Sequence, residues 1–181
     1  LIASYAIGAN TAYCYLRGEF MDDVYSSFKK ALADAYENKL IGNNILKTNI
    51  NIELHDLIGA GAYIVGEETA MLESIEGKKG FPRFKPPFPA VKGLFGSPTI
   101  INNVETLASV PKIMENGPEW FKSAGTKDSP GFKCFSVSGH VNKPGNYEIP
   151  LGTPFKKLLE LAGGMKDGKK IKAVIPGGSS V

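Results

Sequence analysis

The run from Gly59 to Glu68, Gly-Ala-Gly-Ala-Tyr-Ile-Val-Gly-Glu-Glu, is well suited to binding a flat ligand. Its glycines let a ligand approach the backbone closely. Two acids follow where a helix is expected to begin, and they would repel a phosphate from the free N–H groups there. The spacing matches neither a P-loop nor the dinucleotide-binding glycine motif. We therefore expect Glu67 and Glu68 to accept hydrogen bonds from hydroxyl, amide or ring N–H groups, or only to stabilise the start of the helix.

A second candidate is the segment Arg83-Phe-Lys-Pro-Pro-Phe-Pro89, which holds two cations and two aromatic rings on a proline-rich chain. Lys85 is suited to contacting a pyrophosphate and Phe88 to stacking on an aromatic base. A stiff loop presents such groups at low entropic cost. The alternative is a covering loop whose phenylalanines fill the core.

The third candidate lies in Ile100–Thr106, where Asn102 and Asn103 precede an expected helix. Asn102 with Glu105 three positions later resembles a capping box, which is a purely structural role. The same helix start can also bind a phosphate through its exposed N–H groups.

Other chemistry is excluded or unsupported by the residue pattern. The two histidines, His55 and His140, have no nucleophile or acid at a suggestive spacing, so we expect structural roles and no catalytic acid or base. The two cysteines, Cys14 and Cys134, form no C-x-x-C pair and lie in apolar runs. We expect buried free thiols in a reducing compartment and no metal site within this chain.

The charge and hydropathy patterns limit the partners. The net charge is +3 with no concentrated basic stripe, so we predict no nucleic-acid partner. No apolar run approaches the ~20 residues needed to cross a bilayer, so we predict no direct membrane insertion.

Hydrophobic periodicity predicts a βαβ unit with a parallel strand pair in the first part of the chain. A short helix, an irregular proline-containing stretch and a longer helix follow it. The predicted elements are a strand at 11–17, a helix at 20–38, a strand at 49–54, a helix at 68–75, an irregular stretch at 77–99 and a helix from Asn102 or Asn103 to about residue 114.

A polar loop at 124–131 predicts a domain boundary, so we expect one α/β domain at 1–125 and a second domain at 132–181. The second domain has the ββαβ order of the start of a β-grasp fold, and we expect it to be incomplete. Its predicted elements are strands at 132–139, 146–149 and 171–175 and a helix at 154–162.

Taken together, the three candidate segments resemble one protein family. They read Ala60-Gly-Ala-Tyr-Ile-Val-Gly-Glu-Glu-Thr-Ala70, Pro82-Arg-Phe-Lys-Pro-Pro-Phe-Pro-Ala90 and Asn102-Asn-Val-Glu-Thr-Leu-Ala108. They are similar to the flavoprotein subunit of NADH:quinone oxidoreductase, respiratory complex I. The same core occurs in diaphorase subunits of NAD-linked hydrogenases and formate dehydrogenases, which is one alternative. A non-catalytic β-grasp docking module is another.

The resemblance implies a partial Rossmann-like flavin-binding domain followed by an incomplete, soluble-ligand-binding β-grasp domain. It implies that NADH passes a hydride to FMN, which then passes electrons singly to iron–sulfur clusters, with no side chain acting as acid or base. By resemblance, FMN lies against Gly66, Glu67, Glu68, Ile101, Asn102 and Asn103, and NAD(H) contacts Glu68, Lys85 and Phe88.

The resemblance also defines what this chain lacks. The family's flavin phosphate loop should lie upstream of Leu1, and the cysteines of its 4Fe-4S cluster should lie downstream of Val181. Val65 stands where family members commonly have cysteine, with little expected consequence. We therefore expect a central fragment that binds flavin weakly or not at all and is inactive by itself.

For the full-length subunit, the resemblance implies partners in a respiratory complex, namely a thioredoxin-like iron–sulfur subunit and a large iron–sulfur subunit. It also implies a peripheral position on the cytoplasmic side of the inner membrane, or on the matrix side in a mitochondrion.

Overall fold

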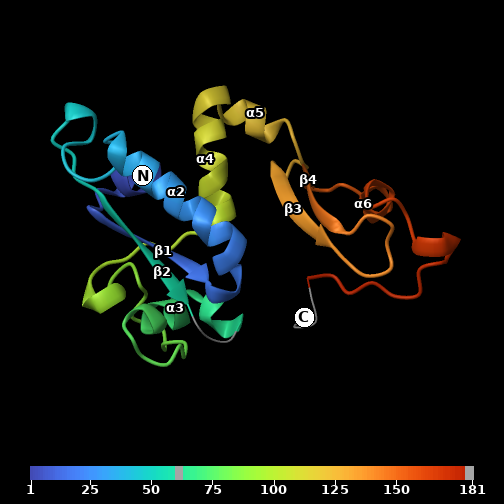
Figure 1. Cartoon of the computed structure of the whole chain (residues 1–181), viewed down its shortest axis with the longest axis horizontal. Coiled ribbons are helices and arrows are strands. Elements are labelled where there is room, and N and C mark those ends of the chain that lie inside the picture. The colour runs from blue at the N-terminus through green and yellow to red at the C-terminus, as the bar shows by residue number, and fades with distance from the viewer. Residues whose placement is uncertain (60–62, 178–181) are drawn as a thin grey trace. The chain divides into compact units, whose positions relative to one another are not determined.

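The computed structural model describes residues 1–59 and 63–177 of the chain (Figure 1). The backbone forms two compact units, Leu1–Leu107 and Ala108–Val181. All of the residues predicted to bind a cofactor belong to the first unit.

The first unit is built on two parallel strands, β1 (Thr11–Arg17) and β2 (Glu53–Gly59). Their register pairs Thr11 with Glu53 at one end and Arg17 with Gly59 at the other. The aromatic and apolar residues of β1 favour a strand, and the predicted range of 11–17 is confirmed. The predicted parallel βαβ arrangement is confirmed as well.

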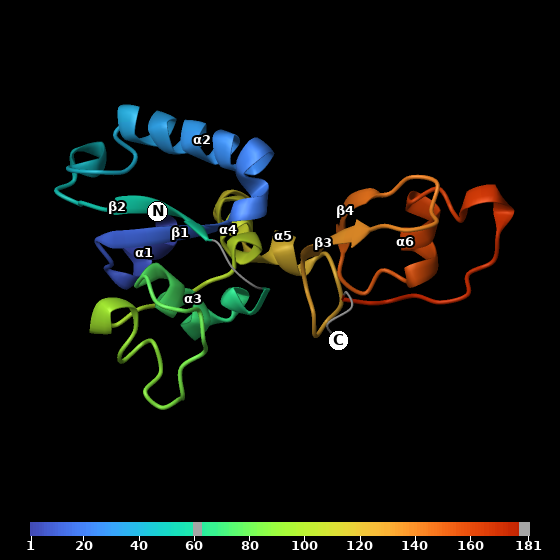
Figure 2. The same ribbon diagram turned by 60° about the horizontal axis from the view of Figure 1, so that its bottom comes forward.

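Helices lie on both faces of this strand pair. Figure 2 shows α2 (Ser26–Glu37) on one face, with α1 (Ile2–Ile7) and α3 (Glu68–Ile75) on the other. A 3₁₀ turn and a π-helical turn precede α2, so the predicted helix over 20–38 is α-helical only from residue 26. Asp56 of β2 accepts a hydrogen bond from Tyr25 Oη in the π-helical turn at 2.7 Å and one from Lys29 Nζ in α2 at 3.3 Å. These contacts attach the helical segment to the sheet.

The prediction of a strand at 49–54 is wrong in its bounds, because β2 begins only at Glu53. Ile52 is buried, as the alternating pattern predicted, but its backbone pairs with Gly42 through hydrogen bonds of 2.7 and 3.0 Å. Residues before Glu53 therefore belong to the turn that enters the strand. The register with β1, which a local pattern does not contain, sets where the strand starts.

The stretch between α3 and α4 (Val104–Asn116) has little regular structure, as its prolines predicted, and contains only the 3₁₀ turn Leu94–Gly96. It is held by its own hydrogen bonds: the carbonyl of Phe88 accepts from Val91 N at 2.9 Å, and the carbonyl of Pro89 accepts from Thr99 N at 2.9 Å. The two X-Pro bonds at Lys85-Pro86 and Pro86-Pro87 are cis. We call residues 77–99 the proline loop.

The cap of α4 differs from the predicted capping box. Asn103 Oδ1 accepts a 2.8 Å hydrogen bond from Glu105 N, so Asn103, and not Asn102, caps this helix. An N-cap side chain typically accepts from the backbone N–H two or three residues later in the chain, and Asn103 accepts from the N–H two residues later.

The second unit continues from α4 into α5 (Pro118–Lys122) and then a hairpin. Strands β3 (Phe132–Val137) and β4 (Gly145–Pro150) pair antiparallel, and α6 (Phe155–Leu161) follows. The predicted strand at 171–175 is wrong: these residues have no regular structure, and Ile175 is exposed. A strand needs a hydrogen-bonded neighbour, and within the described residues this segment has none.

Among the described residues, both units contain buried apolar side chains. Those in the first unit are Ile41, Ile45, Ile52, Val65, Ala70, Leu72 and Leu94, and those in the second are Val141, Ile149 and Ala162. Among residues 1–59 and 63–177, no helix is long and apolar enough to cross a membrane.

The expectation of two buried thiols is wrong, because neither cysteine is fully buried. Neither cysteine forms a disulfide; Cys14 is half-buried, whereas Cys134 is exposed. Burial and the neighbouring Asp56 carboxylate raise the pKa of the Cys14 thiol. Cys134 lies on β3 of a two-stranded sheet, which leaves part of its surface uncovered.

Candidate functional site

Glu67 is the N-cap of α3. Its Oε2 atom accepts hydrogen bonds from Thr69 N at 2.9 Å, Ala70 N at 2.8 Å and Thr69 Oγ1 at 2.6 Å. The carboxylate thus occupies the N–H groups that would otherwise be open to a phosphate. The structural interpretation of this acid, stabilisation of the helix start, is confirmed.

The ionisation of Glu67 follows from these contacts. Partial burial opposes the charged form, but the hydrogen bonds from Thr69, Ala70 and Lys85 outweigh it and lower the pKa of the carboxyl. Glu67 is therefore a carboxylate at neutral pH, with Oε1 turned to Lys85 and Oε2 to its own helix.

Lys85 reaches from the proline loop to the start of α3. Its ammonium donates to Glu68 Oε1 and lies 3.4 Å from Glu67 Oε1. The hydrogen bond to Glu68 is the largest of the effects that raise the pKa of Lys85. The structure therefore brings together three of the predicted site residues, Glu67, Glu68 and Lys85, from segments far apart in sequence.

The other predicted site residues are placed around this cluster by the backbone. Gly66 directly precedes it, and apart from Gly66 and its two chain neighbours, no described residue has an atom within 4 Å of where a Cβ on Gly66 would stand. Phe88, three residues after Lys85, is 57% exposed. Ala60, Gly61 and Ala62, in the glycine run, lie outside the described residues.

Ile101, Asn102 and Asn103 enter α4 after the proline loop, Ile101 half-buried and both asparagines exposed. Among the described residues, no hydrogen bond or ion pair joins this segment to the Glu67–Glu68–Lys85 cluster. The hydrogen bond from Thr99 N to Pro89 O instead joins the chain just before Ile101 to Pro89, the residue that follows Phe88.

Arg83 has a structural role that was not predicted from the sequence. Its guanidinium donates to Glu73 Oε1 at 2.5 Å, to Glu76 Oε1 at 2.7 Å and to the Gly93 carbonyl at 3.0 Å. The sequence does contain a signal for this role: Glu73 and Glu76 stand three positions apart near the end of a short predicted helix, and Arg83 follows. Hydrogen bonds from Lys78, Arg83 and Phe95 N lower the pKa of Glu76 to about 2, against the effect of partial burial.

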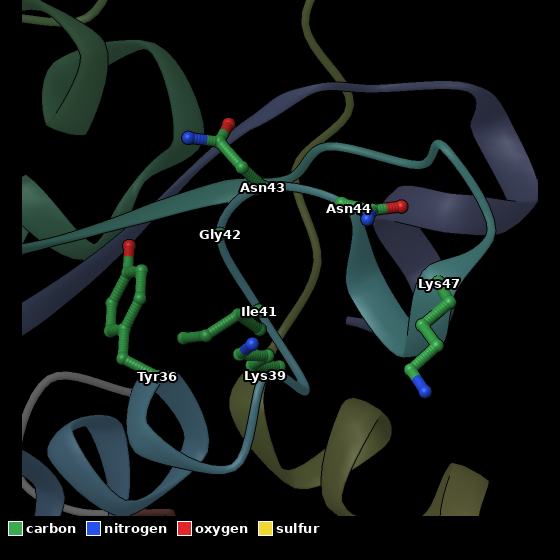
Figure 3. Close-up of a pocket in the computed structure, with 7 residues that line it drawn as sticks. All are labelled: Tyr36, Lys39, Ile41, Gly42, Asn43, Asn44 and Lys47. Atoms are coloured by element: carbon green, nitrogen blue, oxygen red, sulfur yellow. The ribbon is translucent and has the colours of Figure 1, made fainter.

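The pockets formed by the described residues of the first unit include two that we consider as candidate sites. One, of about 490 Å³, is lined by Arg83 with its partners Glu73, Glu76 and Gly93, and by the exposed rings of Phe84 and Phe95. The other, of about 620 Å³, lies between the end of α2 and the turn before β2 (Figure 3). Among the residues that the structure describes, neither is lined by any of the predicted site residues. The second pocket had no sequence signal, and its lysines and asparagines point in different directions (Figure 3).

The family profile described as the Nuo51 FMN-binding domain matches residues 1–112, well over half of the chain. The chain belongs to the Nuo51 FMN-binding domain family. A second profile, the SLBB domain, matches residues 134–181. The predicted fold class, a flavin-binding α/β domain followed by a soluble-ligand-binding β-grasp domain, is confirmed.

Curated relatives of this Nuo51-family chain are F subunits of bacterial NADH-quinone oxidoreductases. The one from Rickettsia bellii is 54% identical over 183 residues, which cover 100% of this chain and 44% of the relative. One from Rhizobium meliloti is 54% identical and is covered to 42%, and one from Mycobacterium bovis is 52% identical and is covered to 40%. The chain thus spans less than half the length of these relatives.

A solved structure is similar over most of the Nuo51-family chain. An NAD⁺-reducing [NiFe]-hydrogenase in the H₂-reduced state aligns with a TM-score of 0.78 and 40% identity, covering 91% of this chain and 27% of the hydrogenase chain. Within the described residues, no group of three or more histidine, cysteine or acidic side chains is arranged to hold a metal ion.

Proposed function

We propose that this sequence forms the face of an NADH dehydrogenase subunit that receives NADH and contacts bound FMN. The observation that carries the proposal is the convergence of Lys85 with Glu68 and Glu67 beside Gly66. The names of the relatives, which are F subunits of NADH-quinone oxidoreductases, support it.

The residues present suit the ring side of a flavin better than its phosphate. The surface beside Gly66 is open, and a Cβ there would fill space that a flat ring can use. The first N–H groups of α3 are already bonded to Glu67, so the phosphate must be bound elsewhere. In this proposal Gly66, Glu67, Glu68, Ile101, Asn102 and Asn103 line the flavin site.

The same cluster is suited to a nicotinamide nucleotide. Lys85 can exchange its carboxylate partners for an anionic phosphate of NADH, and Glu68 is then free to accept hydrogen bonds from the nucleotide. The exposed ring of Phe88 can stack on a base. FMN, when bound, supplies the redox chemistry, and the side chains bind and orient.

The proposal for the protein that contains this sequence extends to its assembly. Electrons leave through iron–sulfur clusters, including a 4Fe-4S cluster held by cysteines outside the present sequence. The partners are a thioredoxin-like and a large iron–sulfur subunit. The assembly lies at the cytoplasmic side of the inner membrane, or at the matrix side in a mitochondrion.

A second candidate is the diaphorase subunit of an NAD-linked hydrogenase, which the similarity to an NAD⁺-reducing hydrogenase favours. Both candidates use the same NADH and flavin residues. The subunits that co-purify with the protein distinguish them, since only the second predicts a hydrogenase partner.

The test is NADH oxidation by the flavin-loaded, full-length subunit that contains this sequence, with an artificial electron acceptor. Lys85→Gln and Glu68→Gln are compared with Lys122→Gln, which removes an exposed ion pair in α5. Loss of a charge-assisted hydrogen bond should raise the KM for NADH about tenfold or more in the first two variants, at unchanged FMN content. The proposal fails if both behave like the control.

A further inference from the structure

The side chain of Arg83 makes one of the contacts that attach the proline loop to α3. Arg83 uses all three guanidinium nitrogens, two on the carboxylates of Glu73 and Glu76 and one on the Gly93 carbonyl. The side chain of Arg83 is 24% exposed and that of Glu76 only 8%. A planar fork between two fixed carboxylates resists both translation and rotation, which a lysine ammonium does not.

The backbone of Arg83 is fixed independently of its side chain. Its N–H donates a 2.8 Å hydrogen bond to Thr69 Oγ1, and that hydroxyl in turn donates to Glu67 Oε2. Thr69 is 1% exposed. Arg83 is therefore connected through one buried hydroxyl to the carboxylate that lies opposite Lys85.

The C-terminal part of the proline loop is attached to Glu76, one of the two acids that bind the Arg83 side chain. Glu76 Oε1 accepts a 2.8 Å hydrogen bond from Phe95 N as well as the hydrogen bond from Arg83. The segment 83–95 thus begins and ends at Glu76, so a single carboxylate closes the loop that presents Lys85 and Phe88.

We propose that Arg83 is a positioning residue that sets the place of Lys85 and Phe88 in the nucleotide site, with Glu73 and Glu76 as its partners. Lys85 follows Arg83 by two residues, so its Cα lies at most about 7 Å from that of Arg83. A shift of Arg83 is therefore passed directly to Lys85. The inference rests on the proposed function of Lys85 in binding NADH.

A purely structural role for Arg83 makes a different prediction. If the arginine only stabilised the first unit, its replacement would lower the melting temperature and leave the affinity for NADH unchanged in the folded fraction. A positioning role predicts a higher KM for NADH with an almost unchanged kcat, because binding is lost and the flavin site is intact.

The experiment uses the flavin-loaded, full-length subunit that contains this sequence, with the variants Arg83→Lys, Arg83→Gln and Glu76→Gln. We expect the KM for NADH to rise about tenfold for Arg83→Gln and less for Arg83→Lys, with kcat within about twofold of wild type and FMN content unchanged. Glu76→Gln keeps the arginine and its hydrogen bonds to Glu73 and Gly93, but weakens the contacts of Arg83 and Phe95 with residue 76. We therefore expect a smaller rise in the KM for NADH than in Arg83→Gln.

Lys78→Gln is the matched control. Lys78 binds the same two carboxylates, at 2.7 Å from Glu76 and 3.7 Å from Glu73, but its side chain is 59% exposed. It serves as the control because its ion pairs join Lys78 to Glu73 in α3 and to Glu76 at the C-terminal end of α3, and not to the segment 83–95. This variant should leave the KM for NADH unchanged. An equal rise in KM for Lys78→Gln and Arg83→Gln would attribute the effect to lost charge and overturn the positioning role.

Amide hydrogen exchange gives a readout that needs no NADH oxidation. Exchange at Arg83 and Phe95 should quicken in Arg83→Gln and stay slow in Lys78→Gln. An unchanged KM for NADH in both Arg83 variants contradicts the inference even if the protein is less stable. If the wild-type subunit does not oxidise NADH, the proposed function fails, whereas the exchange data still report on the attachment of the loop.

Discussion

Glu67 accepts a 2.6 Å hydrogen bond from the hydroxyl of Thr69, a side chain that is 1% exposed. The same hydroxyl accepts the backbone N–H of Arg83 at 2.8 Å. One buried oxygen thus joins the start of α3 to the proline loop, which are the two segments that carry Glu68 and Lys85. The stability of this junction and the geometry of the candidate site are consequently linked.

Replacing Thr69 by valine should destabilise the protein more than replacing it by serine. Valine keeps the shape but leaves the N–H of Arg83 without its acceptor, which costs about 1–3 kcal/mol. Serine keeps the hydroxyl and loses a methyl group, a loss of roughly 1 kcal/mol. Urea unfolding measures both free energies; a valine variant as stable as the wild type would contradict the role of the hydroxyl.

Removing the cap of α3 tests Glu67 separately from its neighbour. Glu67→Ala should lower the free energy of unfolding by about 1 kcal/mol, because two backbone N–H groups lose their acceptor. Glu68→Ala removes only a surface ion pair with Lys85 and should cost clearly less, because exposed ion pairs contribute little to stability. Equal losses, measured by thermal unfolding of the two variants, would show that Glu67 does not cap the helix.

Acid should weaken the attachment of the proline loop through Glu76. Its pKa falls from 4.5 to about 2 in the folded protein, so its contribution is present above pH 4.5 and is lost as the pH falls toward 2. Glu76→Gln should be less stable than wild type by roughly 1–3 kcal/mol near neutral pH.

That difference in stability between wild type and Glu76→Gln should shrink to about half or less near pH 3. Denaturant unfolding of the two proteins across this range provides the measurement. A difference independent of pH would mean that the ionised carboxylate is not what holds the loop.

Two glycines should respond in opposite ways to alanine. A Cβ on Gly59 would overlap the ring of Tyr15, whose hydroxyl lies 2.8 Å from Ser74 Oγ, so Gly59→Ala should cost about 1–3 kcal/mol of stability. A Cβ on Gly66 meets no described atom, so Gly66→Ala should unfold like wild type but bind FMN more weakly. Unfolding curves and flavin titration of both variants check this, and unchanged flavin binding in Gly66→Ala would remove Gly66 from the site.

Local patterns predicted some elements well. The bounds of α3 follow from Glu67 at its start and a glycine after its end, and those of β1 from an uninterrupted aromatic and apolar run. These signals are encoded within a few residues of the element itself. The resemblance to the family adds that the first domain binds flavin, which periodicity alone could not give.

Features that depend on distant partners were missed. The start of β2 depends on its register with β1, and residues 171–175 read as a strand because periodicity does not report whether a neighbouring strand is present. Arg83 was not assigned a role because its partners, Glu73, Glu76 and Gly93, meet only once the proline loop has folded back on α3. The pairing of Lys85 with Glu68 was missed for the same reason.

The most direct test of the proposed function is anaerobic mixing of NADH with the flavin-loaded, full-length subunit that contains this sequence, followed by the visible absorbance of the flavin. We predict rapid bleaching in the wild type. We also predict that Lys85→Gln, with the same FMN content, reaches half of its maximal bleaching rate only at about tenfold higher NADH. Flavin that stays oxidised with NADH, or a Lys85→Gln variant with the wild-type dependence on NADH, would contradict it.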